Sequence, residues 1–147
     1  MNDEVRVAIN DGPDLVSARA EGRALAERQG FSRTDATLIA TAISEVARNI
    51  VVHVGHGEIV LRALNEPRRC GLAVIARDDG PGIRDVEAAL SHGATTGAGL
   101  GLGLPGARRL MDDFEVESAP GEGTTVTMVK WRVRDELELM RERRMRA

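Results

Sequence analysis

Apolar and polar residues along the chain follow two periodicities, which predict a domain of mixed strands and helices. Residues alternate strictly in "EVRVAI" at the start, and apolar residues then recur at helical spacing over two long segments. We expect strands at 4–9, 58–64, 71–77, 114–118 and 124–133. We expect helices at 13–30, 32–53, 85–90 and 105–113, and the charge-dense tail after Arg134 is expected to be helical as well.

Composition narrows the class of protein. The chain has 147 residues, of which 42% are hydrophobic and 29% charged, and this predicts one globular domain without internal repeats. A net charge of −3 and three aromatic residues give no support for nucleic-acid binding. Cys70 is the single cysteine, and the start "MNDEVRVAIN" lacks the pattern of a signal peptide. We therefore expect a cytoplasmic protein that is not inserted in a membrane.

The stretch "GAGLGLGLPGARRL" carries four glycines at alternate positions, Gly97 to Gly103. Bare backbone N–H groups before a helix form an anion site. A dinucleotide fingerprint matches formally at Gly101, Gly103 and Gly106, but no strand pattern precedes it, and the Lys-Ser or Lys-Thr of a P-loop is missing. Helix packing in a membrane and a surface linker are the other interpretations, and three regularly spaced leucines argue against the linker.

Glu45 and Asn49 in "SEVARN" are four residues apart and share one face of the second predicted helix. They flank the apolar stripe, so a carboxylate there must face a cleft or a partner. A surface glutamate beside an edge asparagine is the plain alternative. His53 extends the same face, but a transition-metal site is disfavoured because asparagine is a poor zinc ligand.

A third pattern, "ARDDGPGI", places Asp78 at the end of a predicted strand, followed by Gly80 and Gly82. An aspartate can accept a hydrogen bond from an exocyclic amine, and glycines allow a flat ligand to approach the backbone. An ordinary acidic turn after a strand is the alternative.

In this order, followed by "GEGTTV", the three patterns resemble the ATP-binding motifs of the gyrase, Hsp90, histidine-kinase and MutL (GHKL) superfamily. Within it, "ISEVARNIVVHVGHGEI", "DDGPGI", "GLGLGLPGARRLMDDFEVES" and a final "KW" look like the RsbT-type serine-protein kinases of the bacterial stressosome. The resemblance covers nearly the whole chain. It implies the Bergerat ATP-binding fold, an α/β two-layer sandwich in which helices cover one face of a mixed, mostly antiparallel sheet.

The resemblance also implies a role for each matching residue. Asp78 would receive the adenine amino group, with Thr124 nearby through water. Asn49 would hold Mg²⁺ and Glu45 would be the general base, while Arg48 would meet the γ-phosphate or an acidic residue of a partner, unless it is simply exposed. The glycines would make room for adenine or form a lid over the triphosphate. The implied ATP-binding set is Asn49, Asp78, Gly80, Gly82, Gly97, Gly99, Gly101, Gly103 and Thr124.

The implied function is an ATP- and Mg²⁺-dependent serine/threonine-protein kinase that phosphorylates STAS-domain scaffold or antagonist proteins and then switches to an effector such as a PP2C-type phosphatase. The alternative is an anti-sigma factor kinase that binds and inhibits a sigma factor. We expect residues 1–133 to form the kinase domain and 134–147 a charged tail, longer than is usual in this branch. No phosphoacceptor-histidine helix and no transducer domain are expected.

Overall fold

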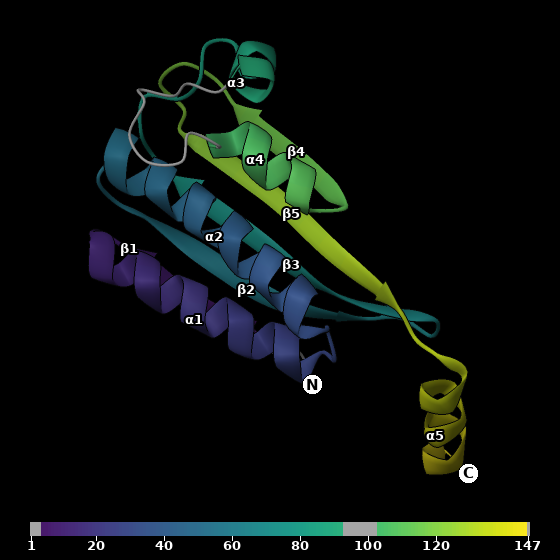
Figure 1. Cartoon of the computed structure of the whole chain (residues 1–147). Helices are drawn as coiled ribbons and strands as arrows, with labels where there is room; N and C mark the ends of the chain where they lie inside the picture. The colour runs from purple at the N-terminus through teal and green to yellow at the C-terminus, as the bar shows by residue number, and fades with distance from the viewer. Residues whose placement is uncertain (1–3, 93–102, 147) are drawn as a thin grey trace.

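The computed structural model describes residues 4–92 and 103–146. A five-stranded sheet lies behind a layer of helices, and the last helix projects from one end (Figure 1). The strands are β1 (Glu4–Ile9), β2 (Gly57–Asn65), β3 (Arg69–Asp78), β4 (Asp113–Ser118) and β5 (Thr124–Val133). The helices are α1 (Gly12–Arg28), α2 (Arg33–His53), α3 (Val86–His92), α4 (Gly103–Leu110) and α5 (Glu136–Arg146).

The strand order is β1-β2-β3-β5-β4, and every pairing among the described strands is antiparallel. The predicted two-layer α/β sandwich with helices on one face is therefore confirmed, whereas the expectation of a mixed sheet is wrong. The reason lies in the connections. Two long helices in succession separate β1 from β2, so the chain returns to the end of the sheet that it left, and β2–β3 and β4–β5 are hairpins.

The long helices begin where side chains satisfy their first backbone N–H groups. Asp11 caps α1, and its side chain and that of Asp14 bond reciprocally to each other's backbone in a capping box. The Ser32 side chain accepts a hydrogen bond from the backbone N–H of Asp35 at the start of α2. These caps fix the residues at which α1 and α2 begin.

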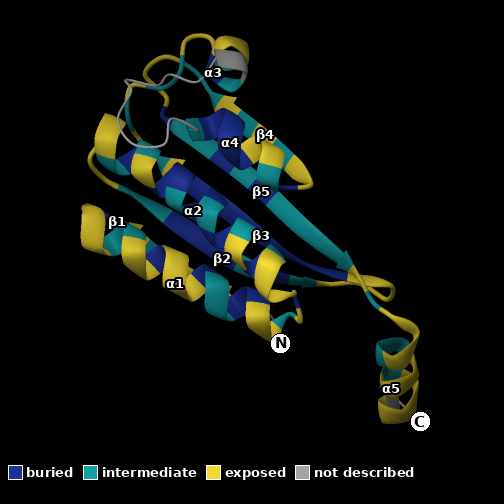
Figure 2. Ribbon diagram, in the orientation of Figure 1, coloured by how far each residue is buried: buried dark blue, intermediate teal, exposed yellow. Residues whose placement is uncertain are grey.

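The core lies between the helices and the sheet (Figure 2). The apolar stripe of α2 includes Ile39, Ile43 and Val46, and it packs against the inner side chains of β2, β3 and β5. β3 is buried almost along its whole length, as expected for the central strand. The outer face of the sheet carries charged side chains, including the ion pair between Arg62 and Glu4 at 2.8 Å.

The predicted elements are confirmed, with shifts of a few residues around α4. This helix begins at Gly103, two residues before Pro105, and ends at Leu110, three residues earlier than expected. The helix ends early because the chain then joins the sheet: the backbone N–H of Asp112, just before β4, donates to the carbonyl oxygen of Val129 in β5, at 2.9 Å. No described helix combines the length and apolar character needed to cross a membrane.

α5 projects beyond the sheet and is held by arginines at the end of β5. Arg132 donates through Nη1 and Nη2 to the two carboxylate oxygens of Glu138, at 2.8 and 2.7 Å. Its Nε donates to the carbonyl oxygen of Gln29 at 2.7 Å, in the connection between α1 and α2. Arg134 forms an ion pair with Glu142. The orientation of α5 is therefore coupled to the body of the domain by charged contacts.

This attachment of α5 should weaken in acid. The hydrogen bonds from Arg132 lower the pKa of Glu138 from its ordinary value of 4.5 to about 2. A carboxyl with a lowered pKa in the folded state stabilises that state above its unfolded pKa, and this stabilisation is lost as the pH falls from about 4.5 towards 2. NMR should show the Arg132 Nη–H signals, whose hydrogen bonds end on Glu138, losing their protection over that range. Glu138→Gln should lose that protection already at neutral pH; an unchanged signal in this variant would contradict the assignment.

Candidate functional site

The second helix presents three of the predicted site residues. Glu45 is 9% exposed and is the one buried charged side chain in the described part of the chain. Its carboxylate makes no hydrogen bond or ion pair with any described residue, although its helix packs tightly against the core. Asn49 follows one turn later and is half-buried, and Arg48 is exposed. A buried carboxylate without a partner is costly, so it is expected where a ligand or a reacting group completes its environment.

Asp78 ends β3, and its carboxylate is already oriented. Its Oδ1 accepts a hydrogen bond from the backbone N–H of Gly80 at 2.9 Å. Its other oxygen, Oδ2, has no partner among the residues that the structure describes. Thr124 is the direct cross-strand neighbour of Asp78, in the register of β3 and β5. One carboxylate oxygen therefore remains available as an acceptor beside a threonine hydroxyl.

Gly57 marks the place where α2 and β3 meet. A Cβ at Gly57 would lie 2.9 Å from Cγ2 of Ile50 and 3.3 Å from Cβ of Asp78. Ile50 is the residue after Asn49, so the turn of α2 that carries Asn49 lies next to the end of β3. The fold thus brings together Asn49, Asp78 and Thr124, with Glu45 one helical turn away from Asn49.

The glycines after β3 are needed for close contacts within the protein. A Cβ at Gly80 would lie 2.6 Å from Cγ2 of Val54 in the α2–β2 connection. Gly82 has a φ of +78°, and a Cβ there would lie 2.0 Å from the carbonyl oxygen of Ala119. This requirement differs from the sequence-based reasoning, which gave these glycines the task of leaving room for a ligand.

Ser118, which the sequence analysis missed, joins this loop to the β4–β5 hairpin. Its Oγ accepts a hydrogen bond from the backbone N–H of Ile83 at 2.8 Å. The same oxygen lies 2.9 Å from the Gly123 carbonyl oxygen and 2.9 Å from Oγ1 of Thr124. One hydroxyl therefore ties three segments together around Asp78 and Thr124. Its sequence context, a serine at the end of a short strand, gives no signal of this role.

His56 was also missed. Its Nε2 lies 2.8 Å from Oδ1 of Asp79, the neighbour of Asp78, so the α2–β2 connection is linked to the loop after β3. Both side chains are mainly exposed. Within the described residues, no three histidine, cysteine, aspartate or glutamate side chains gather closely enough to hold a metal ion by themselves.

The glycine tract is described only at its end. Gly103 begins α4 with a φ of +51°, and the next residues, Leu104 to Ala107, are buried where α4 packs against α2. Gly97, Gly99 and Gly101 lie outside the described residues, so their predicted contacts with phosphates stay predictions. The end of the tract is nevertheless anchored to the same helix that carries Glu45 and Asn49.

Comparison with known proteins agrees with this arrangement. The family described as "Histidine kinase-like ATPase domain" matches residues 10–130. The chain is 45% identical over 131 residues to serine/threonine-protein kinase RsbT of Bacillus subtilis, covering 89% of this chain and 98% of that protein. It is 38% identical over 99 residues to an anti-sigma F factor of Caldanaerobacter subterraneus, covering 63% of this chain and 68% of that protein.

Two solved structures share the fold. One contains the RsbU and RsbW domains of Rv1364c from Mycobacterium tuberculosis, with a TM-score of 0.59, 22% identity, and coverage of 90% of this chain and 32% of that one. The other is the mycobacterial sensor histidine kinase MprB, with a TM-score of 0.50, 16% identity, and coverage of 91% and 99%. Together with the family match and the extent of the RsbT similarity, these findings show that the chain belongs to the RsbT-type serine/threonine-protein kinases of the histidine kinase-like (GHKL) ATPase superfamily, which use ATP as phosphoryl donor.

Proposed function

We propose that this kinase transfers the γ-phosphoryl group of ATP to a serine or threonine of a STAS-domain protein, with Glu45 as general base. The observation that carries the proposal is the Glu45 carboxylate, which is buried, has no partner among the described residues, and lies one turn from Asn49 on α2. A base in such a position can accept a proton from a bound hydroxyl group.

In the proposed reaction, the substrate hydroxyl oxygen attacks the γ-phosphorus while the bond to the β–γ bridging oxygen breaks and ADP leaves. Glu45 takes the hydroxyl proton. Arg48, which is exposed on α2, would contact the γ-phosphate. The donor set also suits a magnesium ion, since the amide oxygen of Asn49 is a hard ligand that can share the ion with phosphate oxygens. Bound there, Mg²⁺ would neutralise charge on the phosphates.

The adenine ring is assigned to the end of β3. The free Oδ2 of Asp78 would accept a hydrogen bond from the adenine amino group, and Thr124 would contact the ring through water. Gly80 and Gly82 keep this loop in place. The backbone N–H groups of Gly97, Gly99, Gly101 and Gly103 would meet the triphosphate as a lid.

Asp78→Asn should weaken ATP binding. The amide presents N–H donors toward an adenine amine that also donates, and one unsatisfied polar contact costs about 1–3 kcal/mol, or roughly tenfold or more in affinity. Calorimetry with ATP measures the change. Asp79→Asn is the matched control, since it makes the same substitution one residue away, and it should bind ATP nearly normally. Equal affinity of Asp78→Asn and the unmodified protein would remove Asp78 from the adenine site.

The proposed cellular role is partner switching. After phosphorylating its STAS-domain partner, the kinase would be released to an effector such as a PP2C-type phosphatase, in the cytoplasm, where ATP is available. The similarity to RsbT, which extends over nearly that whole protein, supports this role, and we assign it to residues 1–133. The similarity to anti-sigma F factors supports the second candidate, a kinase that holds a sigma factor and inhibits it.

One experiment separates the two candidates. The purified protein is incubated with γ-labelled ATP and each STAS-domain protein encoded beside its gene, and its binding to sigma factors is measured in parallel with ATP or ADP. Phosphoserine or phosphothreonine on a STAS protein, without sigma binding, supports the proposed function. ATP-dependent binding of a sigma factor would favour the anti-sigma candidate, and transfer to no STAS protein would overturn the proposed substrate class.

A further inference from the structure

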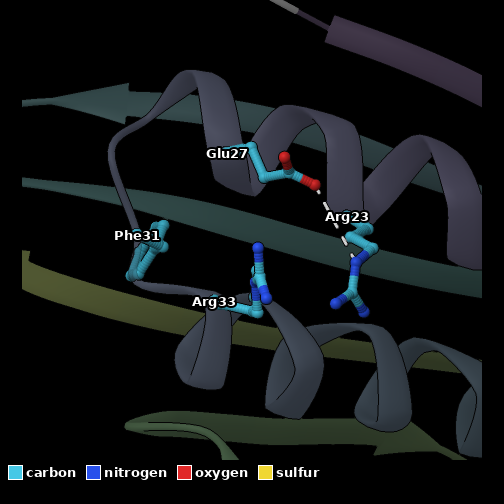
Figure 3. A pocket seen from close by; sticks show the side chains of 5 residues that line it. Arg23, Glu27, Phe31 and Arg33 are labelled. Carbon is cyan, nitrogen blue, oxygen red and sulfur yellow. Dashed lines mark ion pairs between the residues drawn. The ribbon is translucent and has the colours of Figure 1, made fainter.

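A pocket of about 590 Å³ lies between α1 and α2, where one helix passes into the other (Figure 3). It is lined by Arg23, Glu27, Phe31, Arg33 and Ala36. This position is at the opposite end of α2 from Asn49 and Asp78, so the pocket is separate from the proposed ATP site. The sequence analysis assigned no role to any of these residues.

The charges in the pocket are unequal. Arg23 is held in place, because its Nη2 donates to Oγ1 of Thr37 at 3.0 Å and its Nε lies 3.8 Å from Oε1 of Glu27. Arg33 extends from α2 into the space between the helices (Figure 3), and its guanidinium makes no hydrogen bond or ion pair with another described side chain. Two guanidinium groups therefore face one carboxylate, and the guanidinium of Arg33 remains available for an anion.

The base of the pocket is formed by Phe31 and Ala36, which are 6% and 1% exposed and belong to the core. The surface open to a ligand is therefore mainly polar. A carboxylate fits this surface, because Arg33 can bind its two oxygens in a bidentate manner. The chemistry thus points to an acidic side chain.

The pocket and the proposed base lie on one helix. Arg33 and Glu45 are twelve residues apart on α2, which at 1.5 Å per residue corresponds to about 18 Å along the helix axis. Twelve residues also turn by about 120° around the axis, so the two side chains point to different sides of α2. A folded protein that presents its hydroxyl group to Glu45 and extends over the side of α2 can reach both, whereas a short peptide around the same hydroxyl cannot.

We infer that the α1–α2 pocket is a docking site for an acidic side chain on the protein substrate of this kinase. The identification of that partner as the substrate rests on the proposed function; the pocket itself does not. Docking here would hold the substrate without taking part in the chemistry. It should therefore lower KM for the intact protein and leave kcat unchanged.

The pocket can be tested without knowing the partner. The probes are two acetylated and amidated five-residue peptides, one alternating leucine and glutamate, the other alternating leucine and glutamine. In an NMR titration, the glutamate peptide should shift the backbone amide signals of Phe31, Ala36 and Thr37, and the glutamine peptide should not. Arg33→Glu should weaken binding about tenfold, since it removes charge-assisted hydrogen bonds and adds repulsion.

Arg141→Glu on α5 is the matched control, because it makes the same change of charge away from the pocket. It should bind the glutamate peptide like the unmodified protein. Both variants should keep ATP affinity, which shows that they are folded. If both variants weakened binding of the glutamate peptide equally, the effect would come from overall charge and the pocket would not be the binding site. If the glutamate peptide shifted none of the signals of Phe31, Ala36 and Thr37, the pocket would not be a binding site for acidic side chains.

A kinetic arm tests the link to the substrate. With a STAS-domain protein that is phosphorylated in the assay above, Arg33→Glu should raise KM about tenfold at unchanged kcat, and a short peptide around the modified residue should be phosphorylated equally by both forms. Transfer without any effect of Arg33→Glu would refute the docking inference alone. Peptide binding in the pocket without transfer to any STAS protein would refute the proposed function alone.

Discussion

Glu45→Gln is expected to reduce phosphoryl transfer by about 10²–10⁴-fold, the usual effect of losing a general base. The amide keeps the size and shape of the carboxylate but cannot accept the hydroxyl proton at neutral pH. Because the Glu45 carboxylate makes no hydrogen bond or ion pair with described residues, the fold should be preserved. Single-turnover transfer of labelled phosphate to the STAS-domain substrate measures the rate, and calorimetry measures nucleotide affinity.

Affinity for ATP should remain close to normal in Glu45→Gln, since the proposed adenine and lid contacts do not involve this side chain. Ser44→Ala is the matched control on the neighbouring position: its hydroxyl donates only to the carbonyl of Ala40 within α2, at 3.0 Å, and its loss should leave the rate nearly unchanged. Asn49→Ala should differ from both variants by weakening Mg-ATP binding as well as transfer. Near-normal transfer by Glu45→Gln would show that another group is the base.

Gly82→Ala is expected to destabilise the protein by about 2–5 kcal/mol. The left-handed backbone costs a residue with a side chain about 1–2 kcal/mol, and forcing an extra methyl group into a filled space costs about 1–3 kcal/mol more. Here the φ is +78°, and the new Cβ would meet the carbonyl oxygen of Ala119 at 2.0 Å. The backbone must shift, so the loop after Asp78 should move as well. Urea denaturation measures the free energy of unfolding.

Gly121 offers a closely matched control in the β4–β5 turn. Its φ is +79°, nearly that of Gly82, but a Cβ there would meet no heavy atom within 4 Å. Gly121→Ala should therefore cost only the backbone term, about 1–2 kcal/mol. ATP affinity should fall in Gly82→Ala and stay normal in Gly121→Ala. If both variants lost the same free energy of unfolding, the clash with Ala119 would add nothing to the destabilisation caused by Gly82→Ala.

Residue patterns along the chain were enough to predict the helices and strands and the spacing of Glu45 and Asn49 on one helix. Alternation and helical spacing predicted the strands and the two long helices, because side-chain direction repeats every two residues in a strand and every 3.6 in a helix. The same periodicity placed Glu45 and Asn49 on one face of α2. The order of the short motifs identified the superfamily, and with it the ATP-using kinase activity.

The contacts between these elements could not be predicted from such patterns. The partners of Ser118, the contact of Gly82 with Ala119 and the ion pair of His56 with Asp79 join residues between 5 and 37 positions apart, and no local pattern encodes such pairs. The pocket with Arg23 and Arg33 likewise exists only because α1 and α2 pack antiparallel. Periodicity specifies which face of an element is apolar, whereas the identity of the residue opposite that face depends on how the chain folds back, which is settled by packing the whole core at once.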